Sequence, residues 1–144
     1  MPHRPIKHVM AKQQILTAPA TLTATEAARM MKLSNIGALM VVEGARLVGI
    51  FTERDALFRV LAEGRDPDAT LLGEVMTRDP QTIGPDRPFG HALHMMFDGG
   101  FRHVPVVENG RPVGMVSARD ALGPELAEFA SELATRQHIG EILG

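Results

Sequence analysis

The residues best suited to chemistry in this chain are a hydroxyl and a carboxylate three positions apart, present twice. Thr52 is followed by Asp55, and Ser117 is followed by Asp120. Each pair comes at a predicted strand-to-helix junction, where unpaired backbone N–H groups favour an anion such as phosphate. The hydroxyl can donate to the same anion, and the carboxylate can accept two hydrogen bonds from a ribose diol. The pattern therefore predicts binding of a phosphorylated nucleoside.

Neighbouring residues fit the same site. Arg54 and Arg119 each add a charged, planar donor fork. Gly49 and Gly114 would let a ligand approach the backbone closely. The competing interpretation is ordinary helix capping, in which the aspartate favours the first helical turn. Capping requires neither the glycine nor the arginine, so their presence in both segments favours ligand binding.

Both segments belong to a longer internal repeat. Residues 49–57 (GIFTERDAL) return as residues 114–122 (GMVSARDAL), 65 positions later. With one residue of slack, residues 8–10 also match residues 74–76. Chance rarely aligns so many positions in register, so the chain is a duplication.

The elements that must position these residues follow the order β-α-β-β-α in each copy. In the first copy, Thr23 and Glu26 have capping-box spacing and begin a helix. The sequence then predicts strands at 38–42 and 47–51, and a second helix from about 52 to 61. The second copy predicts a helix at 86–97 and strands at 104–107 and 112–116. Short strands near 14–17 and 81–83 precede the two units.

Neither half has enough helices to cover both faces of a three-stranded sheet. Burial therefore favours an α/β (α+β) fold whose halves pack sheet to sheet about a pseudo-twofold axis. We divide the chain into a first motif with its N-terminal segment and linker (1–72), a second motif (73–123) and a C-terminal amphipathic helix (124–144).

The C-terminal helix is expected to begin anew, or with a kink, at Gly123-Pro124. Leu126, Phe129 and Leu133 form an apolar stripe along it, together with Ala130. This stripe is expected to pack against the chain's own core or a dimer mate. The alternative is a helix that binds a specific partner.

Bulk composition narrows the class of protein. The chain has 144 residues, 44% hydrophobic and 22% charged, which is typical of a globular domain. A net charge of −2 argues against nucleic acid or an anionic membrane as partner. The absence of cysteine excludes disulfides and thiol nucleophiles. With no apolar run near the roughly 18 residues that span a bilayer, we expect a cytoplasmic protein.

Both copies resemble the CBS (cystathionine-β-synthase) domain, whose signature includes Gly-h-h-Thr/Ser-x-x-Asp, where h is hydrophobic. The resemblance covers about residues 7–64 and 73–122. It implies a Bateman-module-type pair that senses an adenosine ligand and is not an enzyme. The ligands implied are AMP, ADP, ATP, NAD or S-adenosylmethionine, with no catalytic cofactor and no metal. It further implies a homodimer and an unidentified regulated protein.

By the same resemblance, Asp55 and Asp120 hold ribose and Thr52 and Ser117 hold phosphate. Backbone and apolar groups at Ala18 and Ile83 border the adenine. The full set of expected ligand-binding residues comprises Thr17, Ala18, Asn35, Ile36, Gly37, Ala38, Thr52, Arg54, Asp55, Thr82, Ile83, Phe101, Arg102, His103, Val104, Pro105, Ser117, Arg119 and Asp120.

The two copies are not equivalent, because Arg102 and His103 replace Gly37 and Ala38. We therefore expect unequal sites, with tighter binding of a phosphorylated ligand where Arg102 and His103 point.

Two rival functions stay open. One is a structural or interaction module whose clefts are empty. The other is an enzyme, although the chain has no Gly-x-x-x-x-Gly-Lys-Ser/Thr loop and no Gly-x-Ser-x-Gly elbow. His91 and His94, near Asp98, have the spacing of two metal ligands but lack a fixed third.

Overall fold

The computed structural model describes residues 4–10 and 13–143, with side chains as far as residue 140. The first half contains a four-stranded sheet in the order β1-β2-β3-β4, in which β1 runs parallel to β2 and the other pairs are antiparallel. Its elements are β1 (Thr17–Pro19), α2 (Ala24–Ser34), β2 (Ala38–Glu43), β3 (Arg46–Thr52), α3 (Glu53–Asp55) and the π-helix η1 (Ala56–Leu61).

Helix α2 begins and ends where local chemistry predicts. The Thr23 hydroxyl accepts a hydrogen bond from the Glu26 N–H at 3.2 Å, as expected for a cap. Asn35 closes the helix in the left-handed conformation, with φ of 53°. The buried face of α2, formed by Ala24, Ala27 and Met31, packs on the first hydrophobic core.

The second half repeats this plan with a smaller sheet. Its elements are α5 (Phe89–Gly99), β5 (His103–Glu108), β6 (Arg111–Ser117), the short 3₁₀-helix η2 (Ala118–Asp120) and α6 (Gly123–Leu143). The short strand expected at 81–83 is reduced to one bridge, between Ile83 and Val106. Helix α5 begins three residues later than predicted, because Pro88 is its N-cap and Arg87 belongs to the preceding turn.

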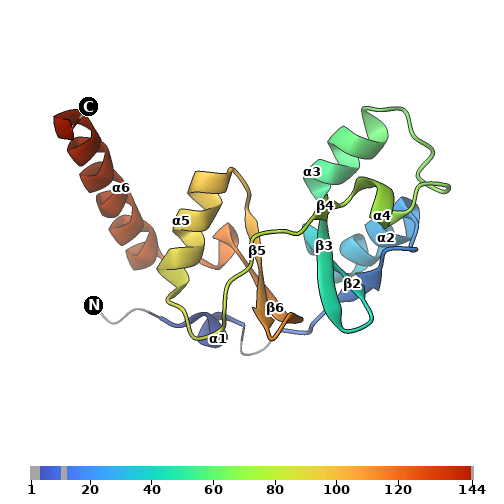
Figure 1. The fold of residues 1–144 in the computed structure, drawn as a ribbon, viewed down its shortest axis with the longest axis horizontal. Coiled ribbons are helices and arrows are strands. Elements are labelled where there is room, and N and C mark those ends of the chain that lie inside the picture. Colours follow the sequence, from blue (N-terminus) through green and yellow to red (C-terminus); the bar gives the residue numbers. More distant parts are fainter. Residues whose placement is uncertain (1–3, 11–12, 144) are drawn as a thin grey trace.

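The segments that lead into each motif pack on the opposite half. Helix α1 (Ile6–Val9) contributes Ile6, with 0% exposure, to the core of the second half. Helix α4 (Leu72–Val75) and β4 (Thr77–Arg78) join the first half, where β4 pairs with β3. Figure 1 shows α1 below α5 and beside the lower end of β6, and α4 beside β3. Each hydrophobic core therefore includes a segment that precedes the other motif in the sequence.

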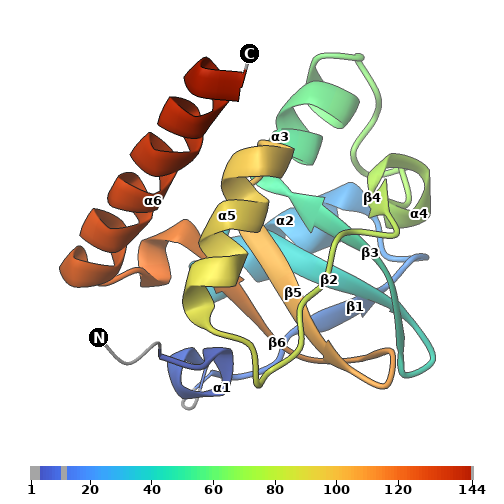
Figure 2. The ribbon, with the colours of Figure 1, turned by 60° about the vertical axis from the view of Figure 1, so that its left-hand side comes forward.

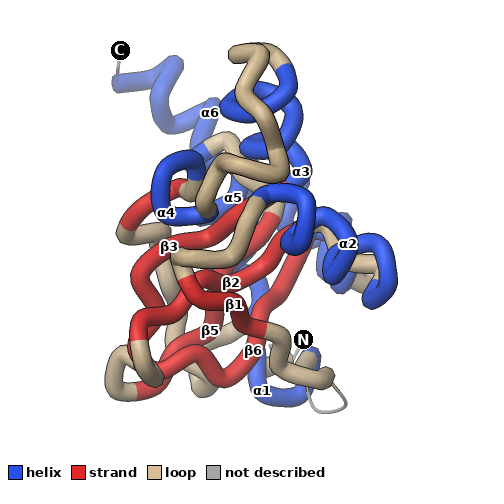
Figure 3. The backbone as a smooth tube through the Cα atoms, turned by 90° about the vertical axis from the view of Figure 1, so that its right-hand side faces the viewer, coloured by secondary structure: helices blue, strands red, loops and turns tan. Residues whose placement is uncertain are grey.

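Strands β3 and β6 contact each other where the two halves meet. Figure 3 shows the strands of both sheets gathered together, with helices outside them. The internal symmetry extends to detail: each hairpin has an irregularity in register at the equivalent place, after Val41 in one and after Val106 in the other. A two-residue turn at Asn109 and Gly110 joins β5 to β6, with φ of 55° and 79°.

Helix α6 starts at Gly123, as predicted, and projects from the second half beside α5 (Figure 2). Phe129 packs edge-on against His94 and Phe97 of α5, with ring centroids 4.8 and 6.0 Å away. Leu126 is 48% exposed. Over the residues described, none of the helices has the length and apolar character needed to cross a membrane.

Candidate functional site

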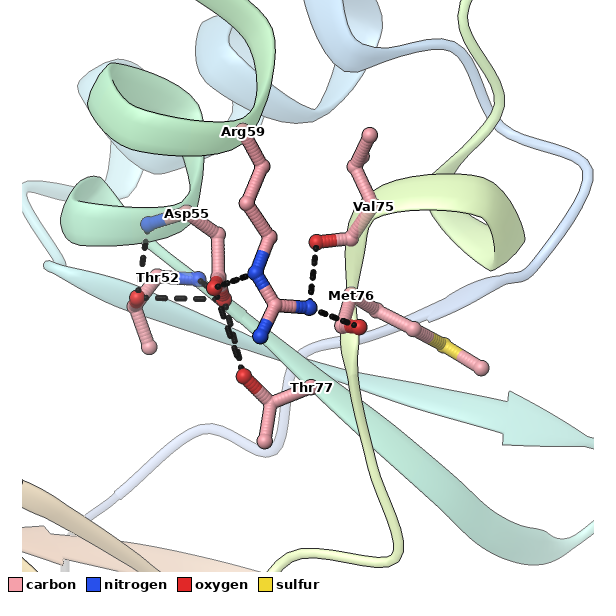
Figure 4. Close-up of polar contacts among 6 residues, drawn as sticks. All are labelled: Thr52, Asp55, Arg59, Val75, Met76 and Thr77. Carbon is pink, nitrogen blue, oxygen red and sulfur yellow. Dashed lines mark hydrogen bonds and ion pairs between the residues drawn. The ribbon is translucent and has the colours of Figure 1, made fainter.

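The first hydroxyl–carboxylate pair lies where β3 passes into α3 (Figure 4). The Thr52 N–H donates to Asp55 Oδ2 at 3.0 Å, and the Thr52 hydroxyl donates to the same oxygen at 3.1 Å. The Thr77 hydroxyl, from β4, donates to Asp55 Oδ1 at 3.3 Å. Asp55 is only 6% exposed. Its carboxylate is thus buried and engaged on both oxygens, in the capping arrangement that competed with ligand binding in the sequence.

Arg59 covers the open side of this carboxylate. Its Nε lies 3.5 Å from Asp55 Oδ1, one helical turn further along the chain. Its Nη1 donates to the carbonyl oxygen of Met76 at 2.9 Å, and lies 3.5 Å from that of Val75. The guanidinium therefore bridges the Asp55 carboxylate and the end of α4, as Figure 4 shows.

The second pair lies where β6 passes into η2 and has fewer partners. The Ser117 N–H donates to Asp120 Oδ2 at 2.7 Å, and the Ser117 hydroxyl lies 3.4 Å from that oxygen. No hydrogen bond from the described residues reaches Asp120 Oδ1. Arg4 donates to the backbone carbonyl of Asp120, at 2.9 Å, and leaves its carboxylate alone. This carboxylate is half-buried, with one oxygen available to a ligand.

His103 lies between the two halves. It is the first residue of β5 and pairs with Ser117 of β6. Its ring packs over Gly37 of the first half: a Cβ at Gly37 would lie 3.4 Å from His103 Cε1 and 3.2 Å from Glu53 Oε1. The absence of a side chain at Gly37 thus makes room for His103. The position at which the two copies differ in sequence therefore lies at the contact between the two halves.

The charge on His103 is disfavoured by its surroundings. Burial lowers the pKa of His103 below the ordinary value of 6.5. The carboxylates of Glu53 and Asp120 oppose this shift, while the cations Arg102 and Arg119 add to it. The pKa of His103 therefore depends on the Asp120 carboxylate and on the neighbouring arginines.

The candidate arginines differ in what they contact. Arg54 donates from Nη1 to the carbonyl of Gly100 at 3.2 Å, which links the two halves, and its guanidinium lies 5.6 Å from the ring of Phe58. Arg102 and Arg119 are exposed, and neither side chain forms a hydrogen bond or ion pair with the described residues. The two arginines that act on His103 are therefore available to a ligand, whereas Arg54 already has structural partners.

The residues expected near adenine lie at one edge of each sheet, beside β2 in the first half and beside β5 in the second. Thr17 and Ala18 form the start of β1 beside β2, and Ala18 is 2% exposed. Ile83, 7% exposed, donates its N–H to the carbonyl of Pro105 at 3.1 Å. Thr82, next to it, is exposed.

In each copy, the segment that leads into the second strand lies at the same end of the sheet as the hydroxyl of Thr52 or Ser117. Ala38 is opposite Thr52, just as His103 is opposite Ser117. The structure therefore brings both expected constellations together, one in each half. Within these segments Asn35 and Arg102 are exposed, Ile36, Gly37, Phe101 and His103 are half-buried, and Ala38, Val104 and Pro105 are buried.

The role expected for the two glycines is wrong. A Cβ at Gly49 would overlap the sulfur of Met76, and a Cβ at Gly114 would overlap the sulfur of Met10. The glycines make room for a methionine from the segment that leads into the opposite motif. They do not open the backbone to a ligand.

Sequence reasoning missed Arg59 and Thr77. A signal for Arg59 was present, because it lies four residues after Asp55, and the equivalent position in the second copy, 65 residues later, is Pro124. Thr77 had no local signal, since it reaches Asp55 through the pairing of β4 with β3.

A pocket of about 350 Å³ lies away from these constellations, between α2 and η1. It includes none of the expected ligand-binding residues. Its lining is mostly apolar and includes three basic residues. It comprises Ala24, Thr25, Ala28, Arg29, Lys32, Ala56, Val60, Leu61, Arg65 and Pro67.

His94, one of the two histidines singled out on α5, has protein side chains as partners. His94 Nε2 contacts the Glu132 carboxylate of α6, and its Nδ1 lies 3.3 Å from Arg136. Asp98 pairs with Arg136 at 3.2 Å. In the described part of the chain, no three His, Asp or Glu side chains are grouped so as to hold a metal ion.

Comparison with known proteins assigns residues 6–62 and 72–123 to the CBS domain. A mitochondrial CBS domain-containing protein of Arabidopsis thaliana is 35% identical over 116 residues, covering 77% of this chain and 56% of that protein. An uncharacterised protein of Methanopyrus kandleri is 33% identical over 118 residues, covering 81% and 60%. The chain thus spans little more than half the length of these relatives.

Solved structures give the same answer. A CBS domain protein from Pyrobaculum aerophilum, complexed with AMP, superposes with a TM-score of 0.79 at 27% identity, covering 89% of this chain and 99% of that one. The CBS domain pair of protein MJ0100, in complex with 5′-methylthioadenosine and S-adenosyl-L-methionine, superposes with a TM-score of 0.75 at 30% identity, covering 83% and 93%. With both domain matches and both halves of the fold in agreement, this chain belongs to the CBS domain family as a tandem pair.

Proposed function

We propose that the chain is a regulatory module that binds an adenosine ligand beside Ser117 and Asp120, and that it carries out no reaction on that ligand. The observation that carries the proposal is the open oxygen of Asp120. A half-buried carboxylate with one engaged and one free oxygen can accept a hydrogen bond from a ribose hydroxyl without losing its support from Ser117.

The groups around Asp120 complement a 5′-phosphorylated nucleoside. Arg102 and Arg119 are exposed, charged and without ion-pair partners among the described residues. His103 would gain a favourable partner from a phosphate, because an anion offsets the cost of charging a buried imidazole. Ile83 and Pro105 supply apolar side chains in the same half, where the resemblance to the family places the adenine.

The chemistry of the ligand is supported by two neighbours. One solved relative is complexed with AMP, and another with 5′-methylthioadenosine and S-adenosyl-L-methionine. All three ligands share an adenosine moiety. The arginines beside Asp120 favour the phosphorylated member, so we place AMP first among the adenosine ligands, ahead of ADP, ATP, NAD and S-adenosylmethionine.

Regulation would follow from the position of His103 between the halves. A ligand that contacts His103 touches a side chain already packed on Gly37 of the first half. Binding would therefore stabilise one arrangement of the two halves over others, and a partner that contacts both halves could detect the difference. A homodimer, a regulated partner protein and a cytoplasmic location stay predictions.

Thermal shift tests the proposal. At a ligand concentration about 100 times Kd, binding adds about 2.7 kcal/mol. This corresponds to a rise in Tm of roughly 5–10 °C for a chain of this size. We expect this rise with AMP and not with GMP, and we expect Asp120→Asn to abolish it. Because the chain has no Trp or Tyr, a co-purified nucleotide would also dominate its ultraviolet spectrum.

The structural rival predicts otherwise. If no adenosine ligand changes Tm and Asp120→Asn behaves as wild type, the chain is an interaction module with empty clefts. The enzyme rival is tested by incubating each ligand with the protein: a product detected by chromatography would contradict the proposal.

A further inference from the structure

The two halves differ in whether the ribose-binding carboxylate is free, a difference that sequence similarity between the copies conceals. In the first half, Asp55 accepts hydrogen bonds from Thr52 and Thr77 and pairs with Arg59. In the second half, Ser117 is the one described residue that donates to the Asp120 carboxylate, and it does so on Oδ2. Exposure follows the same order, since Asp55 is buried and Asp120 is half-buried.

The path of the backbone explains why only the first half has an arginine beside its aspartate carboxylate. After Asp55 the chain continues as the π-helix η1, which places Arg59 over the carboxylate. After Asp120 the chain leaves helical conformation at Ala121, with φ of −69° and ψ of 135°. The position equivalent to Arg59 is Pro124, which has no donor group. No residue of the second copy therefore takes the place of Arg59.

Arg59 is also held from its far end. Its Nη1 donates to the Met76 carbonyl at 2.9 Å, while its Nε faces Asp55. A ligand that used Asp55 to bind a ribose diol would have to displace both Arg59 and the Thr77 hydroxyl. Displacement would leave the Met76 carbonyl without this donor and Arg59 without its carboxylate, and each such loss opposes binding.

We infer that Arg59 and Thr77 occupy, in the first half, the position that the ribose of the ligand takes in the second half. This inference rests on the proposed function and restricts it: the chain binds one adenosine ligand, at Asp120, and Arg59 determines which half is used. Binding at Asp55 is expected to be weaker by at least about tenfold, because the hydrogen bonds from Arg59 to the Met76 carbonyl and from Thr77 to Asp55 must first break.

Isothermal titration calorimetry with AMP measures the number of sites directly. We expect one tight site in the wild type, one in Asp55→Asn and none of comparable affinity in Asp120→Asn. Arg59→Met keeps the apolar stem of the side chain and removes the guanidinium. This variant is expected to show a second site, which Asp120→Asn in the same background leaves as the remaining one.

Arg65→Ala is the matched control. Arg65 is also an arginine ion-paired to a carboxylate, Glu74 at 3.2 Å, but it lies outside the site. Its loss should leave one site. Should Arg59→Met fail to fold by circular dichroism, Thr77→Val removes the other competing group and should raise first-half affinity at least about threefold.

The outcomes separate the two proposals. Two sites of equal affinity in the wild type would overturn the role of Arg59 and leave the proposed function standing. The same conclusion would follow if the first half of folded Arg59→Met and of Thr77→Val bound AMP no more tightly than in the wild type. No heat of binding in any variant, at AMP concentrations up to the millimolar range, would refute the proposed function itself and with it the inference.

Discussion

Replacing Asp55 by alanine should destabilise the fold far more than the same change at Asp120. At 6% exposure, the Asp55 carboxylate accepts from the Thr52 N–H at 3.0 Å, from the Thr52 hydroxyl at 3.1 Å and from Thr77 at 3.3 Å. Loss of a helix cap costs about 1 kcal/mol. The donors left unpaired in a buried position add about 1–3 kcal/mol.

The Arg59 ion pair adds little to this sum, because its side chain is 52% exposed and solvent screens the interaction. The total for Asp55→Ala is about 2–4 kcal/mol. Asp120→Ala loses only the contacts to Ser117 and should cost about 1 kcal/mol. In Tm, these values correspond to decreases of roughly 5–15 °C and 2–4 °C.

Urea denaturation followed by far-ultraviolet circular dichroism suits this comparison, since the chain has no Trp or Tyr for fluorescence. The two variants should have similar m-values and different midpoints. Equal losses of stability at the two positions would refute the reasoning, because they would mean that Asp55 is no more engaged than Asp120.

Three further predictions test other parts of the structure. The pKa of His103 is lowered in the fold, so the unfolded chain takes up this proton first as pH falls below about 6.5. The stability contributed by neutral His103 is therefore present above that pH and lost as pH falls through the lowered pKa. Because His103→Gln removes this titration, the variant should lose less Tm than the wild type between pH 7.5 and pH 5. An unchanged pH dependence of Tm in the variant would contradict this. Ile6→Ala should lower the free energy of unfolding, measured by urea denaturation, by about 2–4 kcal/mol, since Ile6 is fully buried in the second half. Lys7→Ala, at an exposed position next to it, should lower it by under about 0.5 kcal/mol. An Ile6→Ala variant as stable as the wild type would show that the N-terminal segment is dispensable for the fold. Gly49→Ala should lower the free energy of unfolding by about 1–3 kcal/mol, because the added Cβ meets Met76. Gly84→Ala, with open space around the added Cβ, should be within about 0.5 kcal/mol of the wild type. Equal effects of the two substitutions would contradict close packing at Gly49.

Much of the fold could be predicted because its signals are local or periodic. The Thr23 cap, the apolar strands and the turn at Asn109-Gly110 are each encoded within a few residues. The repeat then implied the pairing of two similar halves. Helix α5 began later than expected because Pro88 and the preceding turn displaced its start.

The exchange of leading segments could not be predicted. Helices α1 and α4 have four residues each, too short for a periodic signal. Their packing on the opposite half depends on tertiary contacts such as Met76 against Gly49. The same limitation applied to the site: Thr77 reaches Asp55 from β4, and the Met76 carbonyl reaches Arg59 from the end of α4.

The positions of the two hydroxyl–carboxylate pairs could be predicted from the sequence, whereas the contacts of each carboxylate could not. Both hydroxyl–carboxylate pairs are where the repeat implied, and both show the capping contacts that the sequence could not separate from ligand binding. The inequality of the copies was expected from Arg102 and His103. The structure adds a second source of inequality, the Arg59 guanidinium over Asp55.

A crystal structure of the chain grown with AMP tests the central claim most directly. The account predicts a ribose within hydrogen-bonding distance of Asp120 Oδ1, a phosphate near Arg102, Arg119 and His103, and Arg59 still bridging Asp55 and the Met76 carbonyl. AMP bound at Asp55 with Arg59 displaced, or both carboxylates without ligand at saturating AMP, would contradict it.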